Sequence, residues 1–279
     1  MITNAQKESI VNAMIKTMEE NNFLPWQRSW SYSMIPCNAI TKRTYNGLNV
    51  LLLWCTGYNR MEFATYKQYA ANDITVTPGE HGHKINFFKM YPVENKKKDG
   101  ETEIVNVPYL KQFYVFNVAQ TNYYDGKETE MKQESTFDYK QIDDFISKLP
   151  VKIVYGKEPS YDLAQDVVNI PIFGDFESPE EYYSSLFHEI IHWSGSKSRM
   201  NRKMTTLSMD RNSYSYEECI AEIGSAFLAA HFNLKSEKLA QSNAAYVKSW
   251  IGALKSNPSI LWTAAADAQK AYDYIMKMV

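Results

Sequence analysis

The chain has 279 residues, of which 44% are hydrophobic, and its 32 acidic and 30 basic side chains give a formal net charge of −2. This composition is typical of a globular protein with a buried core and excludes a disordered chain. The near balance of charge excludes nucleic-acid binding through bulk charge, so any such binding must be local. The three cysteines, Cys37, Cys55 and Cys219, form no CxxC pair, which favours a reducing compartment over a disulfide framework.

The N-terminal segment, residues 1–22, predicts an amphipathic helix that carries charged residues along its length. It lacks the uninterrupted apolar segment of a signal peptide. The longest apolar run, residues 50–55, is far shorter than the roughly 20 residues that a membrane-spanning helix needs. We therefore expect a cytoplasmic protein with no membrane partner.

Helices are also predicted in the rest of the first half. Pro25 ends the first helix, because proline cannot continue the helical hydrogen bonds. The dense apolar run over residues 45–58 predicts a buried helix with Gly57 as its stop signal. Residues 63–71 predict another short helix.

Two strands and a linker follow. Alternation over residues 84–90 predicts one strand, and a second is predicted over residues 112–118. Between them, residues 94–103 are charged and lack large apolar side chains, so we expect an exposed hairpin loop. The polar, weakly patterned stretch 124–135 is the candidate interdomain linker.

The second half predicts a helix over residues 139–149, a strand over 151–155, an extended segment over 167–173, and then helices to the end. The extended segment is compatible with an edge strand that pairs with an extended peptide and equally with an ordinary core strand. This order of elements favours two α+β domains, residues 1–124 and residues 135–279.

Three signals mark the start of one helix in the second half. Ser178 can serve as N-cap, Pro179 occupies the first helical position, and Glu181 stands at the reciprocal position of a capping box. We expect this helix to end at Gly195 with a left-handed cap.

The same helix contains the string His188-Glu189-Ile190-Ile191-His192. At 3.6 residues per turn, imidazoles four residues apart project from one helix face, where they can bind a single zinc ion. Zinc lowers the pKa of a bound water to about 7, and the carboxylate of Glu189 can take the proton as the water attacks an amide carbonyl. The pattern therefore predicts Zn2+ as cofactor, His188 and His192 as ligands and Glu189 as catalytic base.

A third protein ligand must come from elsewhere, and the helix expected over residues 216–232 offers Glu218 and Glu222, four apart on one face. We assign Glu218 as the ligand and Glu222 as the carboxylate that orients a ligating histidine. The reverse assignment is compatible with the same spacing. The side chains that could stabilise the oxyanion are Tyr214, Tyr216 and His231, and the sequence does not choose among them.

Two segments of the second half, VNIPIFGDFESPEEYYSSLFHEIIHWSGSKSRMNRK (168–203) and YSYEECIAEIGSAFL (214–228), resemble the zincin-like domain of ArdC-type antirestriction proteins. The first half is similar to the N-terminal domain of that family in the segments PWQRSW, NAITKRTYNGLNVLLLW, FATYKQY and YVFNVAQT. The resemblance covers nearly the whole chain. It implies a single-stranded DNA-binding domain followed by a metallopeptidase domain.

By this resemblance the chain is expected to be a mobile-element protein that protects incoming DNA from restriction, with single-stranded DNA and a protein or peptide substrate as partners. Aromatic rings that stack on bases, interspersed with cations that neutralise phosphates, are typical of such binding. The candidates are Trp26, Arg28, Trp30, Lys42, Arg43, Tyr45, Tyr66 and Lys67.

Two alternative functions are compatible with the same sequence. In the first, the protein binds single-stranded DNA and its zinc domain is catalytically silent and used for protein docking. In the second, the chain is a stand-alone zinc protease, for which residues 1–124 would be dispensable.

Overall fold

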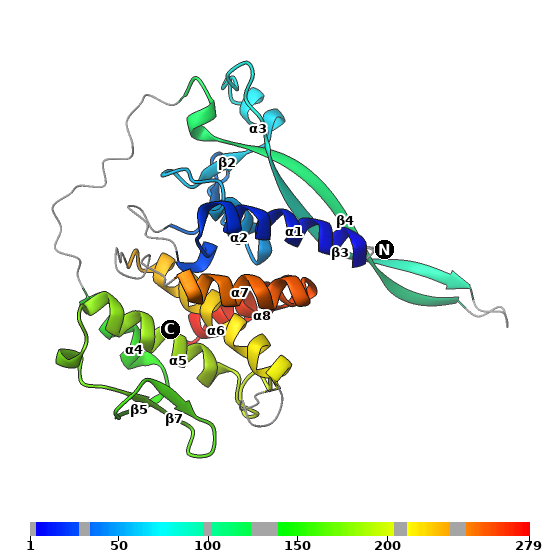
Figure 1. The fold of residues 1–279 in the computed structure, drawn as a ribbon. Coiled ribbons are helices and arrows are strands. Elements are labelled where there is room, and N and C mark those ends of the chain that lie inside the picture. The colour runs from blue at the N-terminus through cyan, green and yellow to red at the C-terminus, as the bar shows by residue number, and fades with distance from the viewer. Residues whose placement is uncertain (1–3, 28–33, 97–101, 124–138, 204–210, 235–243) are drawn as a thin grey trace.

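The computed structural model describes residues 4–27, 34–96, 102–123, 139–203, 211–234 and 244–279 (Figure 1). Helices and strands are mixed in both halves of the chain, which confirms the predicted α+β class. Among the described residues, no helix combines the length and the hydropathy that crossing a bilayer requires.

The first half contains three α-helices, two short 3-10 helices and a four-stranded sheet in the order β1-β2-β4-β3. Their bounds are α1 (Asn4–Asn21), η1 (Pro25–Gln27), β1 (Cys37–Asn38), α2 (Leu48–Trp54), β2 (Glu62–Ala64), α3 (Tyr66–Ala70), β3 (His83–Lys96), β4 (Thr102–Asn117) and η2 (Val118–Gln120).

Strands β3 and β4 form an antiparallel hairpin, paired from His83 opposite Val115 to Lys96 opposite Thr102, that extends well beyond the helices (Figure 1). Both strands are longer than the sequence predicts. Both ends of the charged segment expected as a loop, residues 94–96 and 102–103, are strand, because an exposed ladder is held by backbone hydrogen bonds and needs no apolar side chains. Residues 97–101, at the centre of the expected loop, lie outside the described residues.

Local backbone chemistry determines where the short helices begin. The hydroxyl of Thr65 accepts a hydrogen bond from the Gln68 amide at 3.2 Å, and the Gln68 side chain accepts one from the Thr65 amide at 3.0 Å. This capping box starts α3 at Tyr66, so residues 62–64, mostly predicted as helix, form β2 instead. Helix α2 likewise begins only at Leu48, because Gly47 has a φ of 53°.

The second half contains four long or medium helices, a short 3-10 helix, a nine-residue helix and a three-stranded sheet in the order β5-β7-β6. Their bounds are α4 (Lys140–Lys148), β5 (Lys152–Tyr155), β6 (Ser160–Asp162), β7 (Val167–Ile170), η3 (Phe173–Asp175), α5 (Pro179–Ser194), α6 (Arg211–His231), α7 (Ala244–Ser256) and α8 (Ser259–Met276).

The extended segment before the histidine helix is the central strand of its sheet. Strand β7 pairs in parallel with β5 and antiparallel with β6. The edge-strand interpretation of residues 167–173 is therefore wrong, since both edges of β7 are already paired. The short strand β6 forms the edge of the described sheet.

Helix α5 has the bounds that its capping signals predict. The Ser178 hydroxyl accepts from the Glu181 amide at 3.2 Å, although the Glu181 carboxylate accepts from the amide of Glu177 and not from that of Ser178. The expected left-handed cap at Gly195 is wrong: its φ is −77° and its amide donates to the His192 carbonyl in a continuing right-handed turn. The left-handed residue of this loop is Asn201, with a φ of 50°.

The two halves share one hydrophobic core. Helix α1 lies beside α7, and it also contacts α8 (Figure 1). Trp54 of α2 packs edge-on against Phe227 of α6, with ring centroids 5.7 Å apart, and Trp26 packs the same way against Trp250 of α7 at 5.8 Å. The expected linker, residues 124–135, lies wholly outside the described residues, so the boundaries at 124 and 135 stay a prediction. The shared core indicates that the halves stabilise each other.

Trp54→Ala tests this coupling. The buried indole spans the contact between the halves, so its loss should destabilise the whole chain by about 3–5 kcal/mol in urea unfolding followed by circular dichroism. The control Tyr155→Ala removes a ring that is 78% exposed and should change stability by less than about 0.5 kcal/mol. A biphasic transition in which Trp54→Ala shifts only one phase would contradict a common core.

Candidate metal centre

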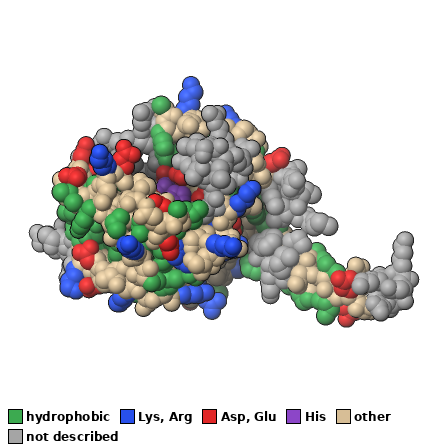
Figure 2. All heavy atoms as spheres, turned by 90° about the horizontal axis from the view of Figure 1, so that it is seen from below, with side chains coloured by type: hydrophobic (Ala, Val, Ile, Leu, Met, Phe, Trp, Pro, Cys, Tyr) green, Lys and Arg blue, Asp and Glu red, His purple; other side chains and the backbone are tan. Residues whose placement is uncertain are grey.

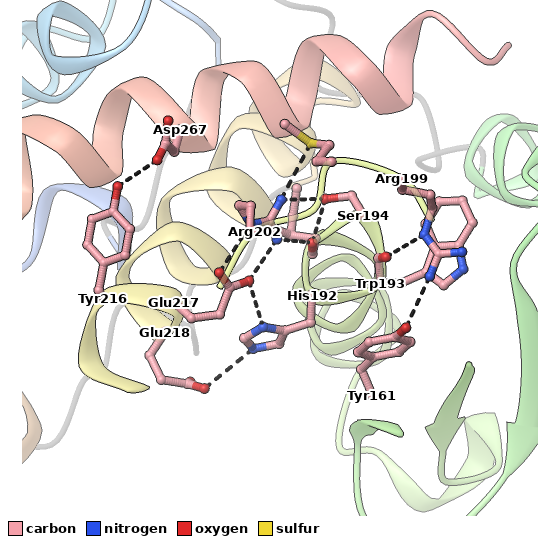
Figure 3. Close-up of polar contacts among 12 residues, drawn as sticks. Tyr161, His192, Trp193, Ser194, Arg199, Arg202, Tyr216, Glu217, Glu218 and Asp267 are labelled. Atoms are coloured by element: carbon pink, nitrogen blue, oxygen red, sulfur yellow. Dashed lines mark hydrogen bonds and ion pairs between the residues drawn. The ribbon is translucent and has the colours of Figure 1, made fainter. Parts of the chain in front are cut away.

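Close packing of α5 against α6 brings the two motif helices together. A Cβ atom added at Gly224 of α6 would lie 2.8 Å from the Cδ1 atom of Ile191 on α5. Only glycine permits this approach without displacing the isoleucine. The short distance between the helices allows carboxylates near the start of α6 to reach the imidazoles of α5 (Figure 3).

Three side chains from these helices converge on one point. The Nε2 atoms of His188 and His192 are 3.1 Å apart, and the Glu218 carboxylate lies 3.5 Å from the first and 3.4 Å from the second. A tetrahedral zinc ion with bonds of about 2.0–2.2 Å separates its ligand atoms by about 3.3–3.6 Å. The two carboxylate–imidazole separations fall in this range and the imidazole–imidazole separation is slightly shorter, so the donors are close to the spacing that a single small cation requires. Their chemistry, two imidazoles and a carboxylate, fits a catalytic zinc site.

Glu217, which the sequence reasoning missed, orients His192. Its carboxylate lies 3.3 Å from Nδ1 of His192 and accepts two bonds from Arg202, of 2.7 Å to Nη2 and 3.1 Å to Nε (Figure 3). A carboxylate on Nδ1 keeps the proton on that nitrogen and leaves the Nε2 lone pair for a metal. No local sequence signal marks Glu217, because its partner Arg202 is brought to it by tertiary structure.

The electrostatics of the cluster favour a bound cation. Burial by itself lowers the pKa of His192, but Glu217 and Glu218 outweigh it and raise that pKa to about 9. Burial would raise the pKa of Glu218, yet the two histidines hold it well below its ordinary value. The Glu218 carboxylate thus places negative charge where the donors meet, while Glu217 lies on the Nδ1 side of His192, where Arg202 pairs with it.

Glu222 has a different partner from the one expected. Its Oε1 atom accepts a 2.7 Å hydrogen bond from the hydroxyl of Tyr246 on α7, and the described contacts pair it with neither histidine. The orienting role assigned to Glu222 therefore belongs to Glu217, one residue before the ligand candidate. The reason is geometric: residues four apart lie one turn along the helix, whereas Glu217 and Glu218 reach the same ring from two sides.

Glu189 and Glu222 line a cleft of about 240 Å³ beside His188, which we call the metal cleft. Histidine side chains are visible in a recess of this face (Figure 2). Glu189 is 7% exposed, and burial raises the pKa of its carboxyl group, an effect that the nearby histidines oppose. A raised pKa suits a carboxylate that takes up and releases a proton near neutral pH.

The oxyanion candidates lie elsewhere. Tyr216 donates a 2.6 Å hydrogen bond to Asp267 of α8 (Figure 3), and His231 contacts the Tyr272 hydroxyl at 2.8 Å. The side chain of Tyr214 lies outside the described residues. The Tyr246 phenol donates to Glu222, which lines the metal cleft, and burial and the Glu222 charge raise the pKa of that phenol.

Three of the residues expected to contact DNA have other partners. Trp26 is only 5% exposed and lines the metal cleft, so it offers no surface for base stacking. The half-buried Tyr45 donates to the Phe63 carbonyl at 3.1 Å, and Lys42 pairs with Glu62 at 2.5 Å. Large aromatic rings near a junction between layers are buried because they contribute most to a core.

The other DNA candidates fall into two groups. Arg43, Tyr66 and Lys67 are exposed on the first half, and the ring of Tyr66 is 58% exposed beside Lys67 at the start of α3. Arg28 and Trp30 lie outside the described residues.

The comparisons with known proteins agree with this architecture. Residues 4–116 match the N-terminal domain of the anti-restriction factor ArdC, and residues 140–267 match a zincin-like metallopeptidase. The crystal structure of the antirestriction protein ArdC from plasmid R388, in its metal-free form, is 30% identical and has a TM-score of 0.76 over 98% of this chain and 97% of that chain. This chain belongs to the ArdC antirestriction family.

Other relatives extend the comparison. The uncharacterized protein y4eC of Sinorhizobium fredii is 30% identical over 96% of this chain and 89% of its own length. A DNA primase TraC of Escherichia coli is 29% identical over 96% of this chain, which spans only 27% of that primase. The R388 protein has also been solved in a Mn(II)-bound form, with a TM-score of 0.75. Zincin-like membership implies a metal, and the three clustered side chains are where it would bind.

Glu218→Gln and Glu222→Gln form a matched pair that tests the third ligand. The first removes the charged donor that faces both imidazoles and should lower zinc affinity by more than about tenfold. The second changes a carboxylate that faces Tyr246 and should leave zinc affinity within about threefold. Metal titration with a competing chelator measures both. Equal losses in the two variants would contradict the assignment.

Proposed function

We propose that this chain is a mobile-element antirestriction protein that binds single-stranded DNA and hydrolyses a peptide bond with zinc held by His188, His192 and Glu218. The observation that carries the enzymatic part is the separation of 3.1–3.5 Å among three donors contributed by two helices. Family membership supports the antirestriction part, and the relationship to plasmid primases supports a mobile-element setting.

The donor set favours zinc over manganese in this proposal, because imidazole nitrogen suits zinc while manganese prefers carboxylate, carbonyl and water oxygen. Once bound, the metal would supply Lewis-acid polarisation of the scissile carbonyl and lower the pKa of the attacking water.

The chain's own residues supply the remaining chemistry. The Glu189 carboxylate accepts the proton of the attacking water and returns it to the leaving amine. Glu217 holds His192 in one tautomer, while Arg202 compensates the buried charge of Glu217. The Tyr246 hydroxyl, which donates to Glu222 of the cleft lining, is the candidate donor to a developing oxyanion.

The edge strand β6 is the proposed docking site for an extended peptide. It packs along α5, and a backbone hydrogen bond from Tyr161 reaches the Glu189 carboxylate. An extended substrate added to this edge would place its backbone beside the general base. Pro159, immediately before β6, lines the metal cleft and thereby connects this edge to the metal ligands.

Glu189→Gln separates peptidase chemistry from metal binding. The variant should retain stoichiometric zinc, because Glu189 is not a ligand, and should lose about 10²- to 10⁴-fold in the rate of cleavage of an unfolded protein such as β-casein. The control Glu20→Gln makes the same change on the exposed face of α1 and should cleave normally.

The same variant tests the docking alternative. A catalytically silent domain requires that wild type and Glu189→Gln fail alike to cleave and protect unmodified DNA equally well from restriction in a transfer assay. Loss of protection in Glu189→Gln, with zinc retained, would tie hydrolysis to antirestriction.

Single-stranded DNA binding has a distinct signature. Phosphate contacts release counterions, so affinity for an oligothymidine should fall log-linearly with salt, with a slope of about −0.7 for each phosphate neutralised. Fluorescence anisotropy of a labelled oligonucleotide measures this slope, with the duplex of the same sequence as comparison. Salt-independent or absent binding would remove DNA from the proposed function.

A further inference from the structure

A second, larger hollow of about 540 Å³ lies between the hairpin, the start of α2 and helix α8, and it shares no described lining residue with the metal cleft. We call it the aromatic hollow. Four rings line it: Tyr45, which precedes α2, Phe87 of β3, Phe113 of β4 and Trp262 of α8. Phe87 and Phe113 meet edge-on, with centroids 6.3 Å apart and planes at 86°. Residues from both halves of the chain are therefore required to form it.

The polar lining is rigid and uncharged. The Asn49 side chain makes two 2.8 Å hydrogen bonds with the backbone of Asn86, and Gln269 accepts a 2.9 Å bond from the Gly47 amide. These bonds fasten β3 to α2 and α2 to α8. Within the described part of the chain, the exposed side-chain amide of Asn46 makes no hydrogen bond, and none of the described lining residues carries a charge.

Aromatic side chains continue along the same face of the hairpin. Side chains two residues apart on a strand share a face, so Phe113, Lys111 and Tyr109 line up on β4. Tyr109 packs edge-on against Tyr91 of β3, with centroids 5.6 Å apart, and the Lys111 ammonium lies 5.0 Å from the Phe113 ring. Phe87 and Tyr109 remain 46% and 48% exposed, and clustered exposed rings mark a binding surface.

We propose that the aromatic hollow receives one unstacked base of single-stranded DNA, packed against the rings of Phe87, Phe113 and Trp262 with its edge facing Asn46. This site rests on the proposed DNA-binding function and specifies where it acts. A flat, uncharged, hydrogen-bonding group fits a lining of rings and amides, and the neighbouring Lys111 is placed to neutralise a phosphate. Trp26 is buried at the metal cleft, so we assign base stacking to the aromatic hollow instead of to Trp26.

The test uses the full chain, zinc-loaded, and the anisotropy of a labelled oligothymidine. Phe87→Ala should weaken binding about 5- to 100-fold, as the loss of one stacked base predicts, without changing the salt slope, because no phosphate contact is lost. Trp262→Leu should have an effect in the same range. The control Tyr114→Ala removes a ring that is 55% exposed on the opposite face of β4 and should bind as the wild-type chain does.

An oligonucleotide with abasic sites completes the cycle. Wild type should lose affinity for it, and Phe87→Ala should bind it as wild type does, because the base that the ring contacts is missing. If the variant weakens binding of both oligonucleotides equally, base insertion is overturned. If wild type shows salt-dependent binding that neither Phe87→Ala nor Trp262→Leu changes, the hollow is overturned while DNA binding stands. If wild type does not bind at all, both proposals are overturned.

Discussion

The metal centre depends on one buried carboxylate, that of Glu217. It is 3% exposed and contacts two groups at once, the guanidinium of Arg202 and the imidazole of His192. A buried charge without partners is strongly destabilising, so the three groups must assemble together or not at all. Because Arg202 belongs to the loop that leaves α5, this contact also ties the end of the histidine helix to the start of α6.

The position of Glu217 also determines the position of Glu218. Consecutive helical residues project about 100° apart, so two adjacent carboxylates can reach opposite nitrogens of one ring. Glu217 lies at Nδ1 and Glu218 at Nε2 of His192. Glu217, which orients His192, and Glu218, the candidate ligand, are therefore positioned by the same turn of α6. The close contact at Gly224 sets the distance between α6 and α5.

Local signals made much of this structure predictable. The N-cap at Ser178 and the proline after it gave the start of α5, and the spacing of His188 and His192 gave their common face. Glu217 could not be found in that way, because its role depends on Arg202, a partner fifteen residues away that only the folded loop brings near. Spacing pointed to Glu222 instead, since residues four apart share a helix face and adjacent residues do not.

The same distinction explains the errors in the first half. Burial of Trp26 depends on Trp250, more than 200 residues later, so the cations near Trp26 in the sequence suggested a DNA-binding surface that this ring does not form. The length of the hairpin was underestimated because cross-strand pairing, unlike hydrophobic alternation, leaves no mark in a polar sequence. Elements defined by their own residues were predictable, and elements defined by distant partners were not.

The shared core makes the stand-alone protease the least compatible of the alternatives. Trp26 of the first half lines the metal cleft, and Trp262 of the second half lines the aromatic hollow. Removing residues 1–124 would expose the faces of α6, α7 and α8 that α1, η1 and α2 cover, and it would open one wall of the cleft. The metal cleft in the second half is thus lined partly by the first half, and the aromatic hollow of the DNA-binding half is lined partly by the second. Ligand contacts at either site therefore act on the core that both sites share.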